Sequence, residues 1–465
     1  MAGNVVVNDI HSQLNEAVVA AVETVDSLDA VQASLSTARD EGLAVAVAGG
    51  RHAMGGQQFC AGGMLIDTRP LARVLEFDPD EGTIDVEAGI QWPALLEYLN
   101  EAQLDPVRAW GIAQKQTGAD RLSLGGAVAA NAHGRGLTMT PLIGDVEELT
   151  LVDAGGTVRR CSREENAGLF ALVCGGYGLF GVVYSIKLRL APRRKLERVV
   201  EVRELDGLIE AFEDRIANGF LYGDFQFAID PRSDAFLRRG VFSCYRPVAH
   251  DTPIPNEQHV LSPDDWRSLL YLTHADKARA FELYSSHYLS TSGQIYLSDA
   301  HQFAGYEDDY HRWLDERLGA TDRATEMITE IYVPRARLAD FLAEVAADFA
   351  RTNVNVIYGT VRLIERDHES FLAWARDSWA CVIFNLHTTH TPDELAAAAD
   401  AFRRLISYAV ERGGSYFLTY HRWATTEQLE ACYPQVREFF ALKRAHDPEE
   451  RFQSDWYRHY RDALS

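Results

Sequence analysis

The first third of the chain alternates short apolar segments with glycine-rich loops. Residues 26–41 place apolar side chains at helical spacing after a Ser/Asp cap candidate, and residues 44–50 predict a buried strand that ends in glycine. The glycines that follow, up to residue 63, lead into a second strand instead of a helix. A Rossmann unit needs its glycines to open a helix, so this pattern argues against one.

The pattern continues with strands, turns and few long helices. Strands are predicted at 74–78 and 83–87, and a helix at 91–104. A second glycine-rich block at 121–136 precedes two strand-rich stretches, 145–161 and 178–192. The mixture predicts an α+β unit.

A different pattern follows Pro192, with more helix and more Tyr, His and Trp. Strands are predicted at 355–364 and 380–389, and a further one at 416–423. The tail then carries a helix and a turn, and we expect it to fold back on the first unit. The predicted domains are residues 1–195, residues 196–415 and a returning C-terminal segment, residues 416–465.

Composition narrows the class of partner. With 45 basic and 68 acidic residues the formal charge is −23, which repels nucleic-acid phosphates and anionic lipid head groups. We therefore expect neither nucleic-acid binding nor membrane insertion. The six cysteines are scattered without a C-x-x-C pair, and no basic segment followed by an apolar run opens the chain, so we expect free thiols in the cytoplasm.

The first candidate site is the loop Gly49–Gly56, which contains His52. Consecutive glycines let backbone N–H groups turn toward an anion without interference from a Cβ atom, and a pyrophosphate suits such a nest. An imidazole in this loop would lie beside the bound group. On this segment alone, a histidine in a tight turn explains the residues equally well.

The second candidate is the small-residue stretch 125–134. Glycine and alanine are too abundant there to fill an ordinary core by volume, so a planar ligand or a closely approaching backbone is expected against it. Tight packing of a strand against a helix is the alternative for this stretch alone.

Together these segments resemble a known family of flavoenzymes, the vanillyl-alcohol-oxidase superfamily, with its p-cresol-methylhydroxylase-type FAD domain. The resemblance is carried in order by residues 49–56, 116–136, 141–156, 170–183 and 446–456. It implies an FAD-binding domain of two subdomains and an α+β substrate domain with an antiparallel sheet. It also implies that the isoalloxazine ring lies between the two domains.

The resemblance further implies how FAD is held. In many members the histidine matching His52 is bonded to the flavin 8α carbon. Some relatives add a cysteinyl bond, but residues 117–136 contain no cysteine, so a single attachment is predicted. The positions expected against the cofactor are Gly49, Gly50, Arg51, His52, Ala53, Met54, Thr117, Gly118, Ser123, Gly126, Asn131, His133, Gly134, Gly178, Gly181 and Val182. For His133, a role as a hydrogen-bonded loop histidine stays open beside a redox role.

The substrate side rests on fewer residues. Residues 330–335, beginning with Glu330, resemble a segment of the sugar and aldonolactone oxidase branch. Arg362 occupies the place of the arginine in a Glu-x-Arg motif, but Thr360 replaces its acid; His421 matches a family histidine, but the lysine that follows it in the family is absent. Strand alternation lets either Tyr420 or His421 reach the flavin. The alternative for each residue is a solvated sheet face.

Residues 284–310 are dense in Tyr and His, which suits either a cavity for a hydroxylated ligand or an aromatic domain interface. No residue spacing matches a metal site, so none is predicted.

The sequence thus predicts an FAD-dependent oxidoreductase that transfers a hydride from a sugar, polyol or secondary-metabolite alcohol to flavin N5. Dioxygen or another acceptor would reoxidise the flavin. The expected catalytic residues are Arg362, Tyr420, His421 and Glu330. A carbon–carbon double-bond oxidoreductase of the sterol-reductase kind and a non-catalytic binder on the flavin fold are the alternatives.

Overall fold

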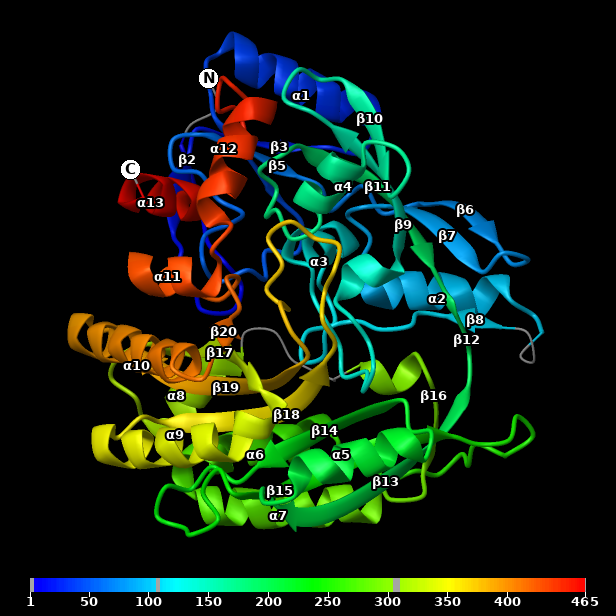
Figure 1. The fold of residues 1–465 in the computed structure, drawn as a ribbon, viewed down its shortest axis with the longest axis vertical. Coiled ribbons are helices and arrows are strands. Elements are labelled where there is room, and N and C mark those ends of the chain that lie inside the picture. Colours follow the sequence, from blue (N-terminus) through cyan, green and yellow to red (C-terminus); the bar gives the residue numbers. More distant parts are fainter. Residues whose placement is uncertain (1–3, 106–108, 304–309, 465) are drawn as a thin grey trace.

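The computed structural model describes residues 4–105, 109–303 and 310–464. Figure 1 shows two regions, one built from the N-terminal part of the chain and the other from a large antiparallel sheet and its helices. The α+β prediction is confirmed. Among the described residues, no helix has the length and apolar character that a membrane span needs.

The first region contains a parallel sheet and an antiparallel sheet. The parallel sheet has the order β3-β5-β4, and the antiparallel sheet has the order β10-β9-β11-β7-β6. Two strand pairs, β1–β2 and β8–β12, lie outside them. The strands are β1 (Val5–Val7), β2 (Ala17–Val19), β3 (Ala21–Thr24), β4 (Val45–Ala48), β5 (Met64–Asp67), β6 (Val74–Asp78), β7 (Thr83–Glu87), β8 (Trp110–Gly111), β9 (Val146–Val152), β10 (Val158–Ser162), β11 (Val182–Arg189) and β12 (Ala191–Pro192). The helices are α1 (Leu28–Asp40), α2 (Trp92–Ala102), α3 (Leu124–Ala130) and α4 (Ala167–Val173).

Helix α1 shows how the sequence pattern sets this packing. The Ser27 side chain accepts a hydrogen bond from the Ala30 N–H and caps the helix. Val31, Leu35 and Ala38 recur at helical spacing and are buried in a cluster with residues of β4 and β5. The helix therefore covers the parallel sheet whose strand β4 leads into the first glycine loop.

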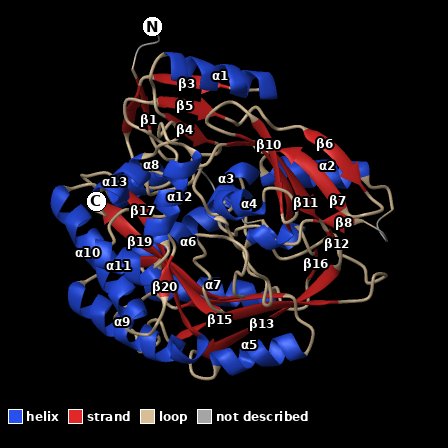
Figure 2. Cartoon of the chain, turned by 45° about the horizontal axis from the view of Figure 1, so that its top comes forward, coloured by secondary structure: helices blue, strands red, loops and turns tan. Residues whose placement is uncertain are grey.

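The second region is organised around the large sheet, which has the strand order β16-β13-β15-β14-β18-β19-β17-β20 and only antiparallel pairs among the described residues. Figure 2 shows its helices around the strands. The strands are β13 (Lys195–Glu204), β14 (Tyr222–Phe227), β15 (Arg239–Pro247), β16 (Ile295–Leu297), β17 (Ala324–Pro334), β18 (Val356–Ile364), β19 (Trp379–Thr389) and β20 (Ser415–Tyr416). The helices are α5 (Leu208–Ala217), α6 (Pro263–Ala275), α7 (Lys277–Ser290), α8 (Tyr310–Leu318), α9 (Leu338–Thr352) and α10 (Pro392–Val410).

The side chains of strand β17 alternate between the hydrophobic core on one face of the sheet and the cavity on the other. Met327, Ile331 and Val333 are buried in the hydrophobic core that includes α9 and α10. Glu326 and Glu330, on the opposite face, line a cavity. Because side chains alternate across a strand, one segment supplies both the apolar support and the polar wall.

The C-terminal segment returns to the first region, where Figure 1 places α12 and α13 beside the N-terminal strands. Phe452 forms a parallel bridge with Val45 of β4, and the Arg451 guanidinium donates to the carbonyls of Ala38 and Leu43. The helices here are α11 (Thr426–Cys432), α12 (Val436–His446) and α13 (Asp455–Ala463).

The strand predicted at 416–423 is wrong. Strand β20 ends at Tyr416, and the following backbone carbonyls turn to the first glycine loop. The Met54 N–H donates to the Thr419 carbonyl at 2.9 Å, and the Gln57 side-chain amide donates to the Leu418 carbonyl at 2.7 Å. Contacts with the first region therefore replace the ladder of a sheet, and the alternation assumed for Tyr420 and His421 does not hold.

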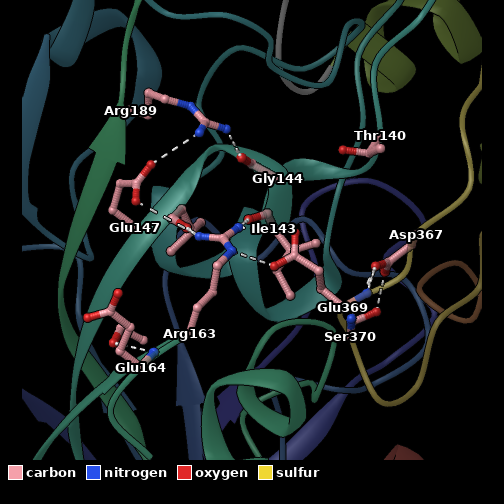
Figure 3. A network of polar contacts seen from close by, with 12 residues as sticks. Thr140, Ile143, Gly144, Glu147, Arg163, Glu164, Arg189, Asp367, Glu369 and Ser370 are labelled. Carbon is pink, nitrogen blue, oxygen red and sulfur yellow. Dashed lines mark hydrogen bonds and ion pairs between the residues drawn. The ribbon is translucent and has the colours of Figure 1, made fainter. Parts of the chain in front are cut away.

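A polar network joins the first region to the loop between β18 and β19 (Figure 3). Arg163 pairs with Glu369 and also donates to the carbonyls of Val146 and Ile143. Nearby, Asn131, the left-handed C-cap of α3, donates to the Asp367 carboxylate at 2.9 Å. The end of α3 is thereby fixed against the second region.

Candidate active site

A cavity of about 790 Å³ lies between the glycine loops of the first region and one face of the large sheet. It has the size usual for a small-molecule or cofactor site. Its walls include both glycine-rich loops, the sheet residues Glu330 and Arg362, and Tyr420 from the returning segment.

Ser123 joins the two glycine loops. Its hydroxyl oxygen lies 3.4 Å from the Gly50 N–H nitrogen and 3.3 Å from that of Gly126, at the start of α3. A Cβ atom on Gly49 would lie 2.0 Å from the same oxygen, so only glycine permits this approach. Two segments more than 70 residues apart thus meet at one wall of the cavity.

His52 lines the cavity with its ring against a second histidine. His11 Nε2 and His52 Nδ1 are 2.8 Å apart, a hydrogen bond in which one of the two nitrogens donates. Burial and, to a smaller extent, the neighbouring His11 lower the pKa of His52 to about 3, against a smaller opposite effect of the Arg121 backbone. The imidazole is therefore neutral at physiological pH and keeps a nucleophilic lone pair.

Buried polar groups on this side are suited to a dinucleotide. The Thr117 hydroxyl and the Gln116 side-chain amide line the cavity, and neither has a hydrogen-bond partner among the described residues. Leaving such groups without partners is costly, so they are suited to a polar ligand. With the glycine cradle, they fit the FAD that the sequence motifs imply.

The opposite wall is organised around Glu330. Its carboxylate contacts His133 Nε2 directly and accepts hydrogen bonds from the Tyr420 hydroxyl at 3.1 Å and the Cys381 thiol at 3.0 Å. The Tyr332 hydroxyl lies 3.3 Å from the same group. His133 also donates through Nδ1 to the Gly134 carbonyl, because a carbonyl can only accept.

The protonation of this cluster follows from its contacts. Burial alone would raise the pKa of Glu330, but the charge and hydrogen bond of His133, with the Cys381 and Arg362 contributions, lower it to about 2. Glu330 is therefore an ionised carboxylate, which can only accept hydrogen bonds. Burial and the Glu330 charge raise the pKa of Tyr420 well above its usual value, so its phenol is neutral.

Arg362 carries a buried charge that faces the cavity. Only 5% of the residue is exposed, and its Nε atom has no hydrogen-bond partner among the described residues. A buried guanidinium is costly unless it is paired, and Arg362 lies in the same cavity wall as Glu330. An electron-rich oxygen of a bound ligand would satisfy it.

The structure brings most of the predicted site residues to the cavity wall. They are Gly49, Gly50, Arg51, His52, Ala53, Thr117, Gly118, Ser123, Gly126, His133, Gly178, Gly181, Glu330, Arg362 and Tyr420. Thr360, which takes the place of the family acid, is fully buried in β18 and is absent from this wall.

Five predicted residues do not line the cavity, and each has a structural reason. The Met54 side chain is in the hydrophobic core, and Val182 packs in the cluster that supports α1. The Asn131 side chain binds Asp367 and the Ile143 N–H, and the backbone of Gly134 binds His133 and Gln114.

His421, predicted as catalytic, is the fifth. Its ring packs against Phe402 and Trp423, and its Nδ1 lies 3.3 Å from the Trp423 N–H nitrogen. Because the chain leaves the sheet at Tyr416, Tyr420 turns into the cavity and His421 turns into an aromatic cluster.

Two arginines of the cavity wall were not predicted from the sequence, and the tyrosine-rich stretch was predicted only as either a cavity lining or an interface. Arg135 and Arg198 line the cavity and lie over the Tyr245 ring. Tyr284, Tyr288 and other members of the aromatic stretch line it too. Residues 304–309 of that stretch lie outside the described residues. Arg135 and Arg198 belong to no recognisable motif, so the sequence does not indicate that they meet at the Tyr245 ring.

Comparison with known proteins identifies the part of the chain that contains the glycine loops. Residues 19–162 match the model of a family described as FAD binding domain. The match begins before β3 and ends in β10, and it contains both loops joined by Ser123. This part of the chain is therefore an FAD-binding domain.

Individual relatives agree with this domain. L-gulono-1,4-lactone dehydrogenase of Mycobacterium tuberculosis is 25% identical over 404 residues, 86% of each chain. Bovine L-gulonolactone oxidase is 29% identical over 191 residues, and the match spans 41% of each chain. Cytokinin dehydrogenase 9 of rice, Oryza sativa subsp. japonica, is 31% identical over 167 residues, 35% of this chain and 31% of its own length. The chain is therefore similar to FAD-dependent oxidoreductases.

Proposed function

We propose that this protein oxidises a CH–OH group of a small hydroxylated molecule, such as a sugar, a lactone or a polyol. The observation that carries the proposal is the arrangement of Arg362 and the Tyr420–Glu330 pair in the same cavity as the glycine loops. The relatives named for gulonolactone oxidation support a donor of this class.

The chain's own residues supply binding and proton transfer. When bound in the cavity, FAD provides the hydride acceptor. Tyr420 accepts the proton of the substrate hydroxyl on its phenol oxygen while passing its own proton to Glu330, 3.1 Å away. The carboxylate gains the proton that the substrate loses, so the relay is balanced.

Arg362 orients the substrate in this scheme. Its buried, cavity-facing guanidinium would donate hydrogen bonds to a substrate oxygen and stabilise negative charge that develops there. The large sheet fixes the backbone of Arg362, because residue 362 pairs with Cys381 of β19. The donor is therefore preorganised and needs little rearrangement.

The proposal includes a covalent bond between His52 and the flavin. The neutral imidazole, its place in the glycine loop and its hydrogen bond to His11 support this. After acid precipitation, the flavin colour should remain with the wild-type protein and be released from His52→Ala. His11→Ala should lower the bound fraction, since His11 orients the reacting ring. Colour released in full from the wild type would contradict the bond.

Two further parts complete the proposal. All six cysteines are free and buried, which supports a reducing, cytoplasmic location. The partners are the small-molecule substrate and dioxygen or another electron acceptor. Neither the double-bond oxidoreductase nor the non-catalytic binder is favoured, because the relatives are named as lactone and cytokinin oxidoreductases.

The test is anaerobic reduction of the FAD-loaded protein by a panel of lactones, aldoses, alditols and matched alkenes. At least one CH–OH donor should bleach the flavin absorbance, and Arg362→Ala should raise the concentration needed for half-maximal bleaching by about tenfold to a hundredfold. Bleaching by alkenes alone, or by no donor, would reject the proposed reaction.

A further inference from the structure

A second polar cluster lies on the large sheet, separate from the Glu330 centre. Its middle residue is Glu326, on the same face of β17 and about 13 Å along the strand from Glu330. His387 of β19 is its direct cross-strand partner, and His274 comes from the last turn of α6. Sequence spacing could not reveal this group, because its members are 52 and more residues apart.

The two carboxylate oxygens of Glu326 have different surroundings. Oε2 lies 2.6 Å from the Tyr310 hydroxyl and 2.7 Å from His311 Nδ1. Oε1 faces the other histidines, with His387 Nδ1 at 3.3 Å and His274 Nε2 at 3.7 Å. Oε2 thus has two short contacts, whereas Oε1 has one long hydrogen bond to His387 and a contact with His274 that is too long for one.

The separations around Oε1 suit ligands of one ion. Ligand atoms about 2.0 Å from a tetrahedral metal ion lie about 3.3 Å from one another. One ring nitrogen of His274, one of His387 and a carboxylate oxygen of Glu326 all lie within 4.8 Å of each other. By contrast, 3.7 Å is too long for a hydrogen bond between His274 and Glu326.

The state of His274 points the same way. Its side chain is 5% exposed, and its Nε2 atom has no hydrogen-bond partner among the described residues. An imidazole nitrogen in its neutral form can donate a lone pair to a metal ion. A buried imidazole nitrogen without a partner is costly unless a ligand completes it.

We propose that His274 Nε2, His387 Nδ1 and Glu326 Oε1 bind one divalent transition-metal ion of the zinc type. Two histidines and one glutamate leave a coordination position for water or a substrate oxygen. Glu326 lines the same cavity as Glu330. Tyr310 and His311 act as positioning residues that hold the second carboxylate oxygen.

The test uses the FAD-loaded protein after treatment with a chelator, followed by titration with Zn²⁺ and measurement of bound zinc. The wild type should bind one ion per chain, and Tyr310→Phe should bind about tenfold more weakly. The double variant His274→Ala/His387→Ala should lose stoichiometric binding. His390→Ala is the matched control, because His390 hydrogen-bonds Thr325 beside the cluster and should leave affinity unchanged.

Equal zinc affinity in the wild type and the double variant would overturn the site, as would binding of much less than one ion by the wild type. Titration with Co²⁺ covers the case in which the double variant does not fold. An intense tetrahedral ligand-field spectrum of the wild type supports the site, whereas the spectrum of the solvated ion overturns it. These outcomes do not depend on flavin reduction by any substrate, so the proposed oxidation stands or falls separately.

Discussion

The two walls of the cavity are built in different ways. The glycine-loop wall relies on the backbone: Gly49, Gly50 and Gly126 approach Ser123 closely, and side chains matter mainly by being absent. The large-sheet wall relies on side chains, with Glu330 and Arg362 placed by strand alternation and cross-strand register. The glycine-loop wall can therefore be recognised from a sequence motif, whereas the large-sheet wall depends on tertiary structure.

Removing one hydroxyl from the side-chain wall should have the largest effect. Tyr420→Phe should reduce the rate of flavin reduction by about 10²-fold to 10⁴-fold, because the proton relay to Glu330 is lost. FAD content should stay at the wild-type level. Tyr222→Phe is the matched control, since its hydroxyl binds the Ala113 carbonyl away from the cavity wall. Equal rates in Tyr420→Phe and the wild type would remove the relay.

Because Glu330 is charged in the folded protein, the free energy of unfolding should decrease at acid pH. Its pKa in the folded protein is lowered from 4.5 to about 2, so its contribution to the free energy of unfolding is full above pH 4.5 and is lost as the pH falls toward 2. The change is on the order of 3 kcal/mol. Urea unfolding of the wild type and Glu330→Gln at a series of pH values measures it. A constant difference between the two proteins across this range would contradict the assignment.

A methyl group tests the backbone wall. Gly49→Ala places a Cβ atom 2.0 Å from the Ser123 oxygen and should displace that residue from both glycine loops. Strain of about 1–3 kcal/mol predicts FAD binding weaker by roughly tenfold to a hundredfold, which equilibrium titration measures. Gly168→Ala, on α4 with no heavy atom within 4 Å of the added Cβ, is the control. Unchanged FAD affinity in Gly49→Ala would separate the loop from the cofactor.

Substitution in the polar network of Figure 3, which joins the two regions, should have the smallest effect. Arg163 and Glu369 are each more than a third exposed, so Glu369→Gln should cost less than about 1 kcal/mol of unfolding free energy. The loss should shrink as salt is added. A larger, salt-independent loss would show that the network of Figure 3 contributes more to the contact between the two regions than its exposure implies.

The sequence predicted the glycine-loop wall of the cavity better than the large-sheet wall. The strand–loop–strand pattern around Gly49 and His52 depends on local chain geometry, and the structure places both at the cavity. His421 does not line the cavity, because contacts of Leu418 and Thr419 with the first glycine loop end the strand early. The His274–Glu326–His387 group was missed because spacing does not bring it together: register pairs Glu326 with His387, and α6 adds His274.

The bridge between Phe452 and Val45 has a consequence for how the protein is made. During synthesis, the nascent N-terminal region emerges long before Phe452 and before the segment that carries Tyr420. The edge of β4 must wait through about 400 residues of translation, open to wrong pairing or to chaperones. A chain truncated before residue 447 would thus lack part of the cavity wall's support, however well its glycine loops were formed.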